Sequence, residues 1–135
     1  MQFDYFEHDA DIGVVGRGAT LEQAFAAGAQ AVFSLITRLD DVQPRERVDV
    51  EFEEADAEFA FVTWINLLLA RAQENGLVLG KFELERDGDR WRGRAWGEPW
   101  RADMERGIDV KGATLTMLSV ARADGGWEAR CIVDV

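Results

Sequence analysis

The fold is decided first by residues 20–38, which read TLEQAFAAGAQAVFSLITR. Thr20 and Gln23 have the spacing of a capping box, in which the two side chains satisfy free backbone N–H groups at a helix start. Apolar or small residues then recur every three or four positions, at Leu21, Phe25, Gly28, Val32, Leu35 and Leu39. The pattern predicts a helix over residues 21–38 whose small side chains allow close approach to a sheet.

Segments on either side of this helix have the period of strands. Residues 3–7 alternate between apolar and polar, and residues 12–15 form a second short apolar run after an acidic turn at 9–11. On the other side, residues 48–53 alternate valine or phenylalanine with acidic residues. The chain therefore opens as strand, turn, strand and helix, and continues with a half-buried strand.

A second helix follows Asp56, which has the side chain of an N-cap, and stops at Asn75-Gly76. Its inward face is predicted to consist of Phe61, Val62, Ile65, Leu68, Leu69 and Ala72. Beyond it only strands are expected. They are residues 77–86, 91–96 before a loop at 97–99, and a final hairpin of 108–121 and 127–135. We expect one α+β domain over residues 1–135, with two helices packed on one face of a mainly antiparallel sheet.

Composition excludes several classes of protein. The chain has 15 basic and 26 acidic side chains, a net charge of −11 and 47% hydrophobic residues, so it is not intrinsically disordered. The negative charge argues against unaided binding to nucleic acid. With one cysteine and one histidine, Cys131 and His8, the chain has neither an internal disulfide nor a Cys/His zinc cage. The acidic N-terminus and the absence of a membrane-length apolar run favour a cytoplasmic protein with no membrane partner.

Catalytic motifs are scarce. Ser34 and Ser119, the only serines, lie within a helix pattern and a strand pattern, and neither belongs to a G-x-S-x-G elbow. The glycines Gly16 and Gly18 lack the third glycine of a dinucleotide fingerprint, and there is no phosphate-binding P-loop motif. We therefore do not expect an autonomous kinase, NTPase or dehydrogenase.

Acidic side chains gather near both ends of the chain. Residues 7–11 read EHDAD, and clustered carboxylates are what hard divalent cations require. An acidic solvated turn is the simpler interpretation of that segment alone. The last residues, Asp134 and Val135, end a patterned strand. If that strand ends near the 9–11 turn, its oxygens converge with those of the turn, and a cation would relieve their repulsion.

Several segments of the sequence resemble the archease family. Residues 7–13, EHDADIG, are similar to the family's EHTADIG, and residues 20–25, TLEQAF, to its TLEEAF. Further matches are WINLL at 64–68, GEP at 97–99, VKGAT at 110–114 and the ending at 126–135. These segments span the chain in the family's order and spacing, and their combination is specific.

The resemblance implies an accessory function, for a protein that is not itself an enzyme and has no catalytic residues. Archeases are protein cofactors of the GTP-dependent RNA ligase of the RtcB type, which acts in tRNA splicing and RNA repair. They promote guanylylation of the ligase and its repeated turnover, with a divalent metal, here Ca²⁺, Mn²⁺ or Mg²⁺. By position, the resemblance implies that Asp11, Asp134 and an oxygen of Val135 hold this metal. It implies RNA contact only through the ligase, and it suggests His8, Asp9 and Lys111 as neighbours of the site.

Two positions depart from the family pattern, and two other functions are also open for this sequence. Asp9 replaces the family's threonine, and Leu115-Thr116 replaces its Tyr-His pair. The chain could instead be an autonomous metal-dependent phosphoester hydrolase, with Glu7 or Asp9 as general base. It could also be an RNA- or protein-binding module that uses the residues sharing one face of a strand, Arg90, Arg92, Arg94 and Trp96.

Overall fold

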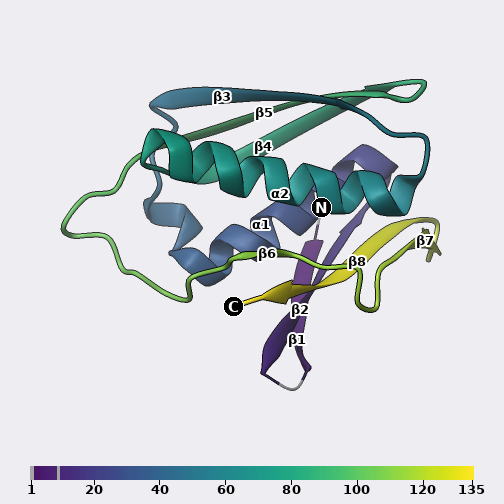
Figure 1. Cartoon of the computed structure of the whole chain (residues 1–135), viewed down its shortest axis with the longest axis horizontal. Helices are drawn as coiled ribbons and strands as arrows, with labels where there is room; N and C mark the ends of the chain where they lie inside the picture. Colours follow the sequence, from purple (N-terminus) through teal and green to yellow (C-terminus); the bar gives the residue numbers. More distant parts are fainter. Residues whose placement is uncertain (1, 9) are drawn as a thin grey trace.

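The protein has the α+β architecture expected from its sequence, with two α-helices and antiparallel strands, in a computed structural model that describes residues 2–8 and 10–135 (Figure 1). The elements in chain order are β1 (Gln2–His8), β2 (Asp11–Gly18), α1 (Leu21–Ile36), a 3-10 turn η1 (Leu39–Asp41), β3 (Glu46–Glu53), α2 (Ala57–Asn75), β4 (Leu77–Asp87), β5 (Arg90–Pro99), β6 (Gly112–Ala113), β7 (Ser119–Ala123) and β8 (Gly126–Asp134).

The strands divide into two sheets, a division that their patterning does not reveal. The five-stranded sheet has the order β1-β2-β8-β6, and β7 also pairs with β8. Its centre joins the two ends of the chain, because Val14 of β2 lies opposite Cys131 of β8. The three-stranded sheet has the order β3-β5-β4. Helix α1 contacts strands of both sheets, β2 and β4 among them, so the helices connect the two sheets.

Helix α1 begins as predicted and ends earlier than predicted. The Thr20 hydroxyl accepts a hydrogen bond from the Gln23 N–H, at 3.1 Å. At the other end the helix stops at Ile36 instead of residue 38, because Thr37 is extended and its hydroxyl donates to the Glu105 carbonyl. Alongside β2 the helix backbone is so close that a Cβ on Gly16 would overlap the carbonyl of Ala24.

Helix α2 has the predicted caps, with the Asp56 carboxylate accepting from two backbone N–H groups and Gly76 left-handed at φ 64°. The predicted inward face omits its largest member, Trp64, which is fully buried. Its indole N–H donates to the Phe25 carbonyl at 3.0 Å, which joins α2 to α1. Next to this contact, Phe25 stacks on Trp91 of β5, with ring centroids 5.0 Å apart.

Two predictions for the second half of the chain are wrong. The expected loop at 97–99 belongs to β5, because Gly97 lies against the backbone of β4, where a side chain would not fit. The expected strand over 108–121 is reduced to β6 and β7. The Gly107 and Ile108 N–H groups donate to the last carbonyls of α1 instead of to a strand, and Met117 turns the chain at φ 52°.

No helix among the described residues is long and apolar enough to cross a membrane.

Candidate functional site

The candidate metal residues lie at one end of the five-stranded sheet. His8 of β1 is opposite Asp11 of β2, and Ile12 is opposite Val133 of β8. Continuing that register by one residue places Asp11 opposite Asp134. Residues that lie opposite each other in antiparallel strands point to the same face, so the structure brings His8, Asp11 and Asp134 into one row on one face.

The strand end that carries Asp134 is held by β6. The Lys111 N–H donates to the Asp134 carbonyl at 2.8 Å, and Gly112 is opposite Asp134 in the ladder. Asn66 of α2 fixes β6 in turn, because its side-chain oxygen accepts from the Ala113 N–H at 2.8 Å. In the sequence, Asn66 belongs to the WINLL segment and interrupts the apolar run 59–70. An amide side chain in an otherwise apolar helix segment was the available signal for its role.

The donors in this row suit a hard cation, which prefers carboxylate and carbonyl oxygens. Asp11 is half-buried and Asp134 exposed, and neither makes an ion pair with another described residue. Within residues 2–8 and 10–135, no three His, Cys, Asp or Glu side chains form a group able to hold a metal. The row therefore offers two carboxylates, and an oxygen of Val135 would supply a third protein ligand. Asp9 lies outside the described residues.

Of the two candidate general bases of a hydrolase, Glu7 is among the described residues, and it is poorly placed. Glu7 is opposite Ile12, one position from the His8–Asp11 pair. Because successive strand residues point to opposite faces, Glu7 faces away from Asp11. Burial raises the pKa of Cys131 to about 12, so this thiol stays protonated and unreactive at neutral pH.

The arginine row of the binding-module hypothesis is paired with acidic side chains. On β5, Arg90 contacts Glu53 and Arg92 contacts Glu51, each at 3.2 Å, and Arg94 contacts Glu85 at 2.8 Å. The hydrogen bond to Arg94 also holds the pKa of Glu85 below its usual value. Acidic residues of β3 and β4 therefore flank the arginines on both sides, which reduces their attraction for phosphate groups.

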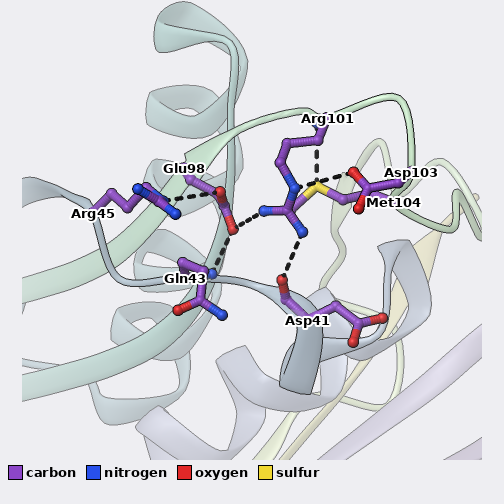
Figure 2. A network of polar contacts seen from close by, with 7 residues as sticks. All are labelled: Asp41, Gln43, Arg45, Glu98, Arg101, Asp103 and Met104. Atoms are coloured by element: carbon purple, nitrogen blue, oxygen red, sulfur yellow. Dashed lines mark hydrogen bonds and ion pairs between the residues drawn. The ribbon is translucent and has the colours of Figure 1, made fainter.

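Glu98, at the end of β5, is a buried carboxylate at the centre of a polar network that the sequence did not predict. It is 2% exposed and accepts a hydrogen bond from the Gln43 N–H at 2.6 Å, while Arg101 and Arg45 lie against its oxygens (Figure 2). Arg101, together with the Gln43 N–H, lowers the pKa of Glu98. Arg101 also reaches the Asp41 carbonyl. This network fixes the start of the segment that ends at Lys111, and burial of a lone glutamate has no periodic signal in the sequence.

Comparisons with known proteins agree over the whole chain. The model of the archease protein family matches residues 3–135. A protein archease of Sulfolobus acidocaldarius is 32% identical over 137 residues, covering 99% of each chain. The solution structure of protein 1598 of Methanobacterium thermoautotrophicum superposes with a TM-score of 0.88 at 30% identity, covering 98% of each chain. The crystal structure of a Thermotoga maritima protein, described as an archease and possible chaperone, shares the fold at 17% identity, with a TM-score of 0.67 and coverage of 96% and 94%.

Proposed function

Because this chain belongs to the archease family, we propose that it is an accessory protein of a GTP-dependent RNA ligase of the RtcB type. In this role it promotes guanylylation of the ligase and its repeated turnover in tRNA splicing and RNA repair. The observation that carries the proposal is the row of Asp11 and Asp134 at an open sheet end, on neighbouring strands and without ion-pair partners among the described residues. The chain itself performs no catalysis.

In this proposal the carboxylates of Asp11 and Asp134, with an oxygen of Val135, hold a divalent cation such as Ca²⁺, Mn²⁺ or Mg²⁺. A cation bound there supplies positive charge that can offset phosphate charge during nucleotidyl transfer. The chain's own residues position it. The Lys111 N–H holds the Asp134 carbonyl, and His8 lies beside Asp11 in the row.

The proposed partner is the ligase, in the cytoplasm, and RNA is contacted only through the ligase. The net charge of −11 and the neutralised arginine row support this assignment, because both oppose direct phosphate binding. Stimulation of RNA joining should saturate as the protein is added, and the protein alone should neither consume GTP nor hold tRNA at physiological salt.

The test compares Asp11→Asn and Asp134→Asn with wild type in multiple-turnover RNA joining. Each substitution keeps the size of the side chain, removes its charge and is expected to abolish stimulation. Asp4→Asn is the matched control, because Asp4 lies on β1, on the same face of the sheet but away from the row. Both site variants should still bind the ligase and compete with wild type. Full stimulation by either variant, or GTP hydrolysis by the isolated protein, would refute the proposal.

A further inference from the structure

A groove of about 970 Å³ runs along the C-terminal half of α2. One wall is α2 from Asn66 to Gly76, and the other is the irregular segment 100–113, which Figure 1 shows leaving β5 and passing to β6. At 1.5 Å per helical residue, the α2 wall is about 15 Å long. An extended polypeptide of about five residues, at roughly 3.3 Å each, has the same length.

The base of this groove is apolar. Buried side chains from three elements line it, including Phe33 of α1, Leu77 of β4 and Val110 of the 100–113 segment. Ile108 also lines the groove and is 41% exposed. Large exposed apolar side chains beside a recess are typical of sites that bind apolar groups.

Two cations line the same groove in a protein of charge −11. Arg106 lies over the Trp100 ring, 3.9 Å from its centroid, and Lys111 lies towards the β6 end. Neither makes an ion pair with any residue in the described part of the chain. The other arginines named above, on β5 and around Glu98, are paired with carboxylates. These two charges are therefore available to an acidic ligand.

The groove is formed before any ligand binds. The 100–113 segment is held at its start by Arg101 on Glu98, and in its middle by the Gly107 N–H on the Ile36 carbonyl, at 2.8 Å. At its end the Lys111 N–H donates to Asp134 and Asn66 holds Ala113. A ligand would therefore not have to order this wall, which lowers the entropic cost of binding.

We propose that this groove binds an extended, acidic polypeptide segment of a partner protein, with apolar side chains on the base and carboxylates at Arg106 and Lys111. The apolar base distinguishes this ligand from RNA, whose backbone would need a continuous positive track. The inference is independent of any metal at the sheet end, although the groove leads to the strand that pairs with Asp134.

The test is a two-dimensional NMR titration of the ¹⁵N-labelled full chain with the acetylated peptide Glu-Leu-Glu-Leu-Glu. We expect shifts at the Trp100 indole, Ile108 and Lys111, with affinity falling as salt is added. The neutral peptide Gln-Leu-Gln-Leu-Gln should bind more weakly by about tenfold. Absence of shifts in the groove, or equal affinity for the two peptides, would overturn the inference.

Groove variants complete the test. Ala70 is exposed and lines the groove, so Ala70→Trp should fill it and weaken peptide binding by about tenfold. Glu74→Trp places the same side chain on α2 outside the groove lining and should bind as wild type does. Ile108→Glu, on the opposite wall, should also weaken binding by repulsion. Unchanged binding by both groove variants, each shown to be folded by its spectrum, would contradict the proposal. Competition by oligouridylate for the same resonances would replace the peptide with RNA as the ligand.

Discussion

Trp64 and Gly93 are predicted to be energetically coupled in the hydrophobic core. The fully buried Trp64 ring lies over Gly93 of β5, where a Cβ would overlap its Cζ3 atom. Trp64→Phe removes the hydrogen bond to the Phe25 carbonyl, which costs about 1 kcal/mol. It also vacates roughly 40 Å³, and cavity cost at about 24 cal/mol per Å³ adds about 1 kcal/mol. The lost transfer of apolar surface adds about 1 kcal/mol more.

The free energy of unfolding should therefore fall by about 3 kcal/mol in Trp64→Phe, and Tm by roughly 10–15 °C for a chain of this size. Trp96→Phe is the matched control, made in β5, the strand that carries Gly93. Its ring is half-buried and is contacted by Lys81, 4.8 Å from the ring centroid, so its loss should cost less than about 1 kcal/mol. Urea unfolding followed by circular dichroism measures both variants, with an unchanged m-value as the check on two-state behaviour.

Gly93→Ala makes the coupling measurable. Alone it should cost about 1–3 kcal/mol, because the new methyl group displaces the Trp64 ring. In the Trp64→Phe background the methyl group enters vacated space, so the same substitution should cost at least about 1 kcal/mol less. Additive effects of the two substitutions would refute this account of the contact, as would a loss below about 1 kcal/mol in Trp64→Phe.

Three further predictions concern other positions. Glu98 has a lowered pKa, so its charge contributes stability above the unfolded value of about 4.5, and this contribution is lost as the pH falls through the folded value. Glu98→Gln should therefore lower the urea midpoint at pH 7, and the difference from wild type should shrink below pH 4.5; a constant difference would contradict this. Gly76→Ala should cost about 1 kcal/mol at φ 64°, measured by thermal melting, although no neighbouring atom lies near the added Cβ. Gly76→Asn should cost less, because asparagine adopts the left-handed conformation more readily than alanine. Cys131 should resist iodoacetamide at pH 8 in the native protein and react once urea unfolds it, as read by mass spectrometry; rapid native labelling would show that the thiol is accessible.

Local signals in the sequence predicted most helices and strands. Where a predicted bound or strand was wrong, a contact between residues distant in the sequence is the reason. The caps at Thr20, Asp56 and Gly76 use side chains or conformations set by neighbouring residues, so each was predictable. The end of α1 was not, because it depends on Glu105, which is distant in sequence from Thr37. In the segment 108–121, apolar and polar residues alternate imperfectly, and this weak alternation suggested a strand. At its start, the N–H groups of Ile108 and of the preceding Gly107 donate to carbonyls of α1, contacts that no local pattern indicates.

The candidate site shows the same division. The sequence predicted Asp11 in an acidic turn and Asp134 near the end of the last strand. Only the pairing of β2 with β8, whose ladder ends at Ile12 opposite Val133, brings these two chain segments together. That the two residues hold a metal together was implied by the family resemblance alone. The supports of the site, Asn66 and Glu98, contact residues that are distant in the sequence. Asn66 is marked only as an amide in an apolar helix segment, and Glu98 has no periodic signal.

The strand order of the five-stranded sheet has a consequence for synthesis on the ribosome. β2 lies between β1 and β8, so one of its two edges has no partner until residues 126–134 have emerged. During translation this edge of β2 stays unpaired until β8 is made, and pairing between such distant segments gives a high contact order, which slows folding. An exposed edge is a template for pairing with other chains. Nascent and newly released chains of this protein are therefore the species most prone to aggregate, and conditions that slow the release of the last strand should lower the yield of folded protein.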